Sequence, residues 1–344
     1  ITVNSAVVAS ELITVSAGED GSGSFALGVA GSLETTDSGS DITVTTGSTS
    51  GDITLAGTTT ALDLVTMTTA SGSINGSGLV TSGTVDLNSS TGIGNTTGVT
   101  LSSSNITADT TTGDIEIASS LGTAVSVSSL TTGTGTISFA QSGGGDLSTG
   151  TVSASGAVVL SNSAGSISLA GIVTSVSLDA TASGAITDGS DGDLTITGLA
   201  EFTAGNIELG NAAGNATNFG TLTFNSAGSV NVSEASSMFV SGSSTAGAGL
   251  ELVSTGGVTL NASVTVVGDT SILAGAISGG ITVNAKLNGS GTILLDSAGE
   301  ITIDAAIDPT TVTLNADDDI TVNSAVVASE LITVSAGEDG SGSF

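Results

Sequence analysis

The sequence lacks several residue types on which catalysis and ordinary globular cores depend. It contains no Cys, His, Trp, Tyr or Arg, and its one basic side chain is Lys286. Without Cys or His there is no Cys–His or Ser–His nucleophile pair and no imidazole for acid–base catalysis. A Ser–Lys pair that uses Lys286 and two-carboxylate chemistry of the glycosidase kind stay formally open. We expect Lys286 on the outer wall, because it takes the outward position of ITVNAKL (281–287). The absence of Cys also excludes disulfides, which fits an extracellular protein that does not use them. We therefore expect a protein that is not an enzyme.

Proline and aromatic residues are also scarce. The 344 residues include one Pro, seven Phe and 51 Gly, yet 38% of residues are hydrophobic and the mean hydropathy is +0.45. This hydrophobic content is too high for a disordered chain. No run approaches 18 apolar residues, so the sequence predicts no membrane-spanning helix. Because the apolar residues are mostly Val, Ile, Leu and Ala, we expect a thin core.

Positive charge is nearly absent. The formal net charge is −31, from 32 acidic residues and one Lys. A basic nucleic-acid-binding surface is therefore excluded, and anionic lipid would be repelled. The compatible partners are cations or proteins with a positive face. We expect divalent cations to promote side-by-side association of such chains.

Short segments of alternating apolar and polar residues recur along the chain. The clearest four obey the pattern apolar–Thr–apolar–Asn/Asp–small–x–apolar: VTLNASV (258–264), ITVNAKL (281–287), ITIDAAI (301–307) and ITVNSAV (320–326). Successive starts are about 20 residues apart, although the spacing shortens slightly from one segment to the next. Alternation with Gly, Ser, Asn and Asp between the segments predicts β-strands and turns, with no helix.

Strands at a spacing of about 20 residues predict a parallel β-solenoid with one coil per spacing. A β-sandwich array would need longer modules with aromatic anchors, and the glycine-rich calcium-binding nonapeptide is absent. We expect three stacked columns of residues along the axis. The polar column is Asn261, Asn284, Asp304 and Asn323; the two apolar columns are Leu260, Val283, Ile303 and Val322, and Val264, Leu287, Ile307 and Val326.

The opening segment 1–25 occurs again, without a change, at 320–344. Ile1 thus corresponds to Ile320, and Phe25 corresponds to Phe344. We therefore interpret residues 1–319 as one repeat unit of about 16 coils and residues 320–344 as the start of the next. This interpretation predicts that the natural polypeptide continues in both directions.

Three strings carry a family resemblance: SGDITLAG (50–57), GSISLAG (165–171) and SAGEITIDAAI (297–307). They resemble the haemagglutinin-type repeats of giant bacterial surface proteins, the filamentous haemagglutinin-like adhesins. The resemblance extends over essentially the whole chain as a pattern of residue types. It implies an all-β, right-handed parallel β-helix that is secreted or attached to the cell surface.

Two acidic clusters are candidate cation sites. The first contains Asp188, Asp191 and Asp193 within a short stretch beside glycines, and Ca²⁺ prefers six to eight such oxygen ligands. The second is the run Asp317–Asp319, whose consecutive side chains point in different directions on a strand. A solvated corner turn is the alternative explanation for either cluster. The metal residues that we predict are Asp188, Asp191 and Asp193, with Ca²⁺ as the ion.

The composition and repeats predict a structural segment of a giant tandem-repeat extracellular fibre, stalk or cell-surface scaffold. The alternative is an adhesin whose solenoid wall binds a carbohydrate or a cell surface. An ice-binding wall is a third hypothesis, weakened because Thr-x-Thr pairs do not recur at one fixed coil position. The aromatic residues give no binding platform, since we expect them to fill the core: Phe139, Phe202, Phe219, Phe224 and Phe239.

Overall fold

The computed structural model describes residues 1–275 and 279–337, which contain β-strands and turns but no helix. Strands pair in parallel with strands about one coil later in the sequence, as in a parallel β-solenoid. The chain makes about 16 turns. The predicted all-β solenoid and its coil number are therefore confirmed.

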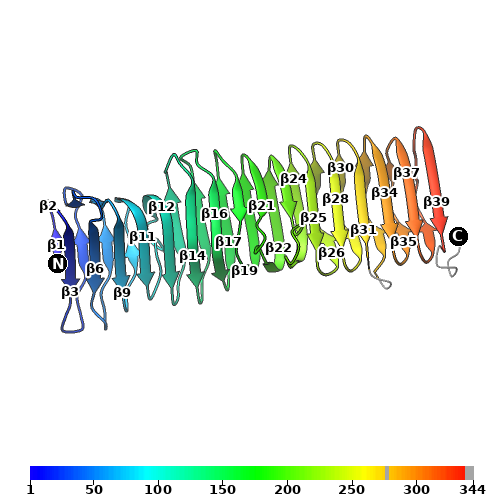
Figure 1. The fold of residues 1–344 in the computed structure, drawn as a ribbon. Coiled ribbons are helices and arrows are strands. Elements are labelled where there is room, and N and C mark those ends of the chain that lie inside the picture. The colour runs from blue at the N-terminus through cyan, green and yellow to red at the C-terminus, as the bar shows by residue number, and fades with distance from the viewer. Residues whose placement is uncertain (276–278, 338–344) are drawn as a thin grey trace. The chain divides into compact units, whose positions relative to one another are not determined.

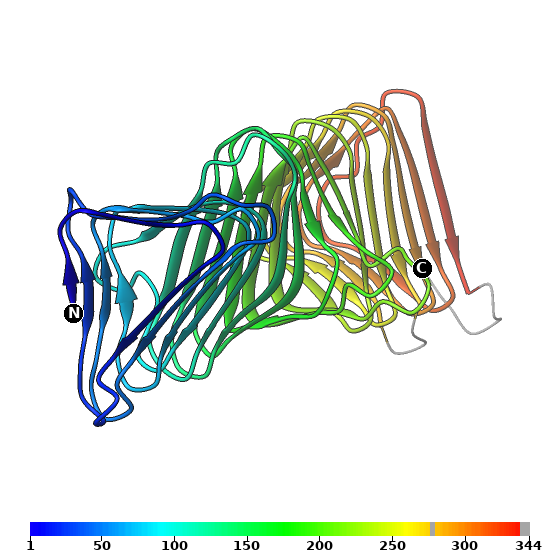
Figure 2. The same cartoon turned by 60° about the vertical axis from the view of Figure 1, so that its left-hand side comes forward.

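The chain divides into two compact units, residues 1–176 and 177–344. This division does not test the repeat boundary predicted at residue 320, and residues 338–344 of the second copy of the opening segment lie outside the described residues. Figure 1 labels the strands, and Figure 2 shows the coils of each unit as stacked loops seen from a second side.

The first unit contains β1 (Thr2–Val3), β2 (Ala6–Ala9), β3 (Leu12–Ala17), β4 (Phe25–Leu27), β5 (Ser32–Thr35), β6 (Asp41–Thr46), β7 (Ile53–Leu55), β8 (Thr58–Thr60), β9 (Leu64–Thr69), β10 (Ile74–Asn75), β11 (Leu79–Ser89), β12 (Val99–Thr110), β13 (Ile115–Ser119), β14 (Val125–Thr132), β15 (Ile137–Gln141), β16 (Leu147–Ala154), β17 (Ala157–Asn162), β18 (Ile167–Leu169) and β19 (Val173–Ser175).

The second unit contains β20 (Ser177–Ala182), β21 (Ala185–Asp188), β22 (Leu194–Ala204), β23 (Asn206–Leu209), β24 (Thr217–Ser226), β25 (Val230–Glu234), β26 (Met238–Val240), β27 (Ser244–Ala246), β28 (Leu250–Ser254), β29 (Val258–Leu260), β30 (Val264–Val266), β31 (Thr270–Ala274), β32 (Ile281–Val283), β33 (Leu287–Gly289), β34 (Thr292–Ser297), β35 (Ile301–Ile303), β36 (Ile307–Asp308), β37 (Thr311–Ala316), β38 (Ile320–Val322) and β39 (Leu331–Ala336).

Each late coil of the second unit has three strands, one on each of three faces. The faces are formed by β25–β28–β31–β34–β37–β39, by β26–β29–β32–β35–β38, and by β27–β30–β33–β36. The strands of the first face lie side by side in Figure 1. Both predicted apolar columns are confirmed, because Leu260 pairs with Val283 and Val264 pairs with Leu287, and the pairing continues to Val322 and Val326.

Other coils have fewer and longer strands. β16 pairs with β18 through its first half and with β19 through its second half. In the second unit, β24 likewise pairs with β26 and β27. One long strand is thus followed by two short ones with a corner between them, and sequence alternation alone does not reveal where that corner falls.

The interior is a stack of inward-facing apolar side chains. In β28 the burial alternates, with Leu250, Leu252 and Ser254 inside and the residues between them half-exposed. Four phenylalanines fill the interior as predicted, each 5% exposed or less: Phe139, Phe202, Phe219 and Phe224. The prediction was wrong for Phe239, which is 40% exposed. Its neighbours Met238 and Val240 face inward, so the alternation of the strand turns Phe239 outward.

The last inward residue of a strand is often a small polar one that binds the following turn. Ser254 Oγ accepts a hydrogen bond from Gly256 N at 3.0 Å, and Ser297 Oγ accepts one from Gly299 N at 3.1 Å. Both hydroxyls also donate to backbone carbonyls of the preceding coil, those of Ser236 and Gly279. These contacts add hydrogen bonds to backbone groups at the buried corner.

Candidate functional site: corner clamps and an acidic groove

An acid or amide at one corner of the coil recurs in both units and binds the backbone of the next coil. Asp114 Oδ1 accepts hydrogen bonds from Thr136 N at 2.8 Å and from Thr136 Oγ1 at 2.9 Å. We call this arrangement a corner clamp. Five clamps have a Gly–Asp or Gly–Asn pair in one coil and a Gly–Ser or Gly–Thr pair in the next: Asp52–Ser73, Asp114–Thr136, Asp146–Ser166, Asn206–Ser229 and Asp269–Thr292.

The glycine before each donor is required by the close approach of the two coils. A Cβ added to Gly135 would lie 2.3 Å from Gly113 O, and one added to Gly228 would lie 2.2 Å from Asn206 Oδ1. Both distances are far below a normal contact, and the atoms that they meet belong to the clamp of the preceding coil. The Gly–Asp and Gly–Ser/Thr pairs therefore form one packing unit that extends over two coils.

The predicted metal residues lie beside a loop of the next coil. Asp188 Oδ2 accepts hydrogen bonds from Gly210 N at 2.7 Å and from Asn215 Nδ2 at 3.0 Å. Asp193 Oδ1 accepts one from Ala216 N at 2.8 Å, while Asp191 is exposed. Two of the three carboxylates thus hold the loop 210–216 in place.

Burial raises the pKa of Asp188 above its ordinary value, and the hydrogen bonds from Gly210 and Asn215 oppose that rise. Within the described residues there is no group of three or more His, Cys, Asp or Glu side chains arranged to hold a metal ion. Asp188 and Asp193 therefore have a direct role in coil packing, and Ca²⁺ binding by Asp188, Asp191 and Asp193 stays a prediction.

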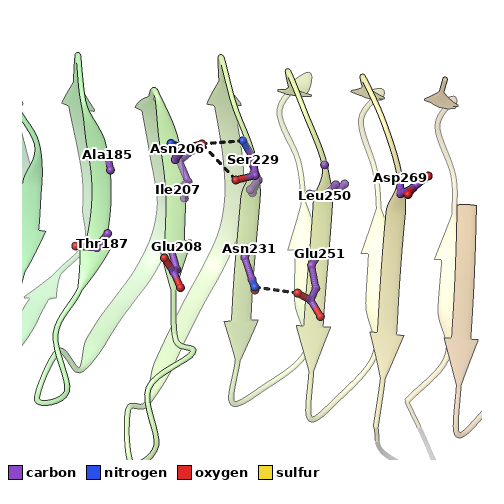
Figure 3. A pocket seen from close by; sticks show the side chains of 12 residues that line it. Ala185, Thr187, Asn206, Ile207, Glu208, Ser229, Asn231, Leu250, Glu251 and Asp269 are labelled. Atoms are coloured by element: carbon purple, nitrogen blue, oxygen red, sulfur yellow. Dashed lines mark hydrogen bonds between the residues drawn. The ribbon is translucent and has the colours of Figure 1, made fainter. Parts of the chain in front are cut away.

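A groove of about 560 Å³ crosses the face formed by β21, β23, β25 and β28. Figure 3 shows three polar side chains on successive strands of this groove, Glu208, Asn231 and Glu251. They share one register column, and Asn231 Nδ2 donates to Glu251 Oε2 at 2.8 Å. Clamp residues Asn206 and Asp269 also line the groove.

The groove combines acidic and polar side chains with aliphatic ones. Its carboxylates are Glu208, Glu251 and Asp269, and none of its lining residues is basic or aromatic. Small-molecule pockets are usually lined mainly by apolar and aromatic side chains. This groove therefore differs from such pockets in its three carboxylates and its lack of aromatic side chains.

One carboxyl group that was not predicted from the sequence, that of Glu234, lies inside the solenoid. Glu234 is 2% exposed; its Oε1 accepts hydrogen bonds from Phe219 N at 2.9 Å and from Ser236 Oγ at 3.0 Å. Its Oε2 is buried with no hydrogen-bond partner among the described residues. Burial raises the pKa of Glu234 to about 7, against the lowering effect of those two hydrogen bonds. The alternation of VNVSE would have placed this residue inward.

Contrary to the prediction, Thr-x-Thr pairs share one position in two successive coils of the first unit. Thr43 pairs with Thr66, and Thr45 pairs with Thr68, so both pairs occupy the same columns. The regular hydroxyl array ends at the next coil, where Asp86 and Asn88 take these positions. The array is therefore short.

Lys286 lies on the outer wall as the sequence predicted, because its side chain is exposed between the inward residues Val283 and Leu287. No helix of the described residues has the length and apolar character needed to cross a membrane.

No protein-family model matches the chain, and no curated protein or solved structure is significantly similar to it. The likeness to filamentous haemagglutinin-like repeats consequently consists of the residue pattern and the parallel β-solenoid.

Proposed function

We propose that this chain is a non-catalytic structural segment of a long tandem-repeat fibre, stalk or cell-surface scaffold outside the cell. The observation that carries the proposal is the corner clamp. The carboxylates of Asp52, Asp114, Asp146 and Asp269 each accept a backbone N–H of the next coil. These four carboxylates therefore stabilise the packing of each coil on the next, which is a structural role.

The resemblance to giant surface proteins and the repeated opening segment support the same function. In this proposal the coils are right-handed, and neighbouring units of one long chain are the main partners. The remaining exposed acids keep neighbouring rods apart at low salt, and divalent cations bridge them.

Imaging of native filaments by electron cryo-microscopy tests this proposal. With about 16 coils in the repeat unit and a strand spacing of about 4.8 Å, one repeat would rise about 77 Å along the axis. A helical reconstruction with an axial repeat of about 70–85 Å and right-handed coils is the expected result. Separate globular domains joined by linkers would contradict the proposal.

A second candidate function is adhesion, and the acidic groove favours it. Glu208, Asn231 and Glu251 offer hydrogen-bonding groups at the spacing of successive coils, as recognition of a hydroxyl-rich carbohydrate would require. A glycan array with the full chain tests it, using Asn231→Ala together with Glu251→Gln as the groove variant. Binding that is lost in this variant would favour adhesion; the absence of binding by the unaltered chain would argue against it.

A further inference from the structure

Residues 210–216 form a loop between β23 and β24 that carboxyl groups hold from two sides. Asp188 and Asp193 of the preceding coil accept backbone N–H groups at the two ends of the loop. Glu234 of the following coil accepts the N–H of Phe219, at the start of β24, at 2.9 Å. The loop and the start of β24 are therefore bound by acidic side chains from both neighbouring coils.

Three buried side-chain oxygens at this corner have no hydrogen-bond partner among the described residues. They are Glu234 Oε2, Thr217 Oγ1 and Asn215 Oδ1. Glu234 and Thr217 are only 2% and 1% exposed, and Ala235 N donates to Thr217 O at 2.9 Å, which places the end of β25 beside the start of β24. Buried polar atoms without partners are costly. This corner is therefore a weak point of its coil, where local opening is easiest.

The acid is peculiar to one coil. Glu234 pairs with Ser254, and the same inward column continues through Ala274, Ser297 and Ala316. The two serines hold their own turns through hydroxyl groups, which do not ionise near neutral pH. A change of protonation in this column consequently acts on the coil of Glu234 alone.

The other carboxyl groups around this corner lie outside the interior or on the far side of the loop. Glu208 on β23 and Glu251 on β28 line the groove on the outer wall (Figure 3). Asp188 and Asp193 contact the loop from the preceding coil. The loop, β24 and β26 contain no titratable residue. Burial, opposed by two hydrogen bonds, therefore raises the pKa of Glu234 to about 7.

We propose that the corner formed by residues 210–219 and 234–237 is a pH-controlled joint of the solenoid. When Glu234 loses its proton, the corner opens locally and admits water, while the coils on both sides stay folded. Opening hydrates the ionised carboxyl together with Thr217 Oγ1 and Asn215 Oδ1. The corner closes again when the carboxyl is neutral. This inference does not depend on the proposed function, since it concerns the contacts of one corner.

The direction of the response follows from the proton affinity of Glu234 in the two states. Its pKa is about 7 in the closed corner and 4.5 ordinarily, so the closed corner holds the proton more tightly than the open one. The closed form is therefore fully favoured below pH 4.5. It loses about tenfold per pH unit as the pH rises toward about 7, and a further rise changes little.

Native-state hydrogen exchange of the full chain at pH 5 and pH 8, corrected for the intrinsic pH dependence of exchange, tests the joint. We expect the protection factor of the Phe219 amide to fall about tenfold or more between these pH values. The internal control is the amide of Gly256, which donates to Ser254 Oγ at the equivalent corner of the next coil and should change less than about twofold. In Glu234→Gln, whose side chain cannot ionise, the protection of Phe219 should be the same at both pH values.

Equal protection of Phe219 at both pH values would overturn the proposal. A parallel loss at Phe219 and Gly256 would do the same, because the opening would then not be local. A fall that persists in Glu234→Gln would assign the response to another group. Asp188→Asn should keep the fall, and its disappearance in that variant would make Asp188 the titrating group and refute the role of Glu234.

A second measurement uses the unaltered chain and needs no variant to fold. The ¹³C resonance of the Glu234 carboxyl should titrate with a midpoint near pH 7, in step with the loss of protection at Phe219. A midpoint near 4.5 would contradict a closed corner around a buried carboxyl. A midpoint near 7 without any loss of protection would show that the carboxyl ionises in place, which would also refute the joint.

Discussion

The side-chain amide of Asn284 donates a hydrogen bond to Asn261 Oδ1 in the coil before it, at 2.9 Å. Asn323 makes the same bond to Asp304 Oδ1 at 2.7 Å. The predicted polar column is therefore confirmed, with bonds in two of its steps. All four side chains are exposed, so water replaces a lost partner and the cost of losing one is modest.

We expect Asn284→Ala to destabilise the coils locally by up to about 1 kcal/mol. Native-state hydrogen exchange at the backbone amides of Asn284 and Asp304 measures the effect. A double-mutant cycle with Asn261→Ala isolates the bond, and its coupling energy should be about 0.5 kcal/mol or more. A coupling energy of zero would show that the column is only a geometric alignment.

The corner clamp predicts a difference between two substitutions at one position. Asp114→Ala removes the acceptor of two hydrogen bonds and should cost about 1–2 kcal/mol of local stability. Asp114→Asn keeps an acceptor oxygen, as Asn206 does in its own clamp, and should cost less than half as much. Chemical denaturation of both variants checks this. Equal losses would mean that charge, and not the acceptor geometry, stabilises the corner.

The clamp also predicts that one glycine cannot be replaced. Gly135→Ala would place a Cβ 2.3 Å from Gly113 O, so the coils must separate, and we expect a loss of about 2 kcal/mol or more. Gly249→Ala is the matched control, since its Cβ would meet nothing closer than Asp269 O at 3.5 Å. Thermal unfolding compares the two. A similar small effect of both substitutions would contradict the close packing at this corner.

The buried carboxyl of Glu234 leads us to expect that the free energy of unfolding depends on pH. Because its pKa is about 7 in the folded chain, against 4.5 ordinarily, the folded state binds more protons between these values. The free energy of unfolding should therefore fall as the pH rises from about 4.5 through about 7. Glu234→Gln removes this dependence and should stabilise the chain at pH 8 by about 1–3 kcal/mol.

Denaturant titrations at pH 5 and pH 8 measure the difference. Glu201→Gln is the control, because Glu201 lies on the outward-facing positions of β22. If the two variants show the same pH profile, the buried carboxyl of Glu234 is not the group that titrates.

Calcium should stabilise the corner around Asp188 and increase association between rods. We expect millimolar Ca²⁺ to raise the unfolding temperature and light scattering relative to Na⁺ at matched ionic strength, with reversal by a chelator. Asp191→Asn removes an exposed charge without disturbing the bonds of Asp188 and Asp193, and should weaken the rise in temperature. Asp63→Asn is an exposed control. Identical behaviour in both salts would remove Asp188, Asp191 and Asp193 as metal residues.

The register of the late coils could be read from the sequence because their spacing varies little. Val283 and Ile303 lie one above the other as their matching motifs predict. The clamps were harder to find, because the partner of Asp114 depends on how many residues the intervening corners contain. Glu234 was missed for a different reason, since an acid suggests the surface although its strand position is inward. The groove depends on which outward side chains are large, and motif spacing does not report that.

The clamps also give the solenoid a direction. In each of the five, the accepting oxygen belongs to the earlier coil and the donating N–H to the later one, as with Asp52 and Ser73. A polypeptide that emerges N-terminus first therefore carries a finished acceptor before the matching donor appears. At the clamps, each completed coil can then serve as the template on which the next one closes.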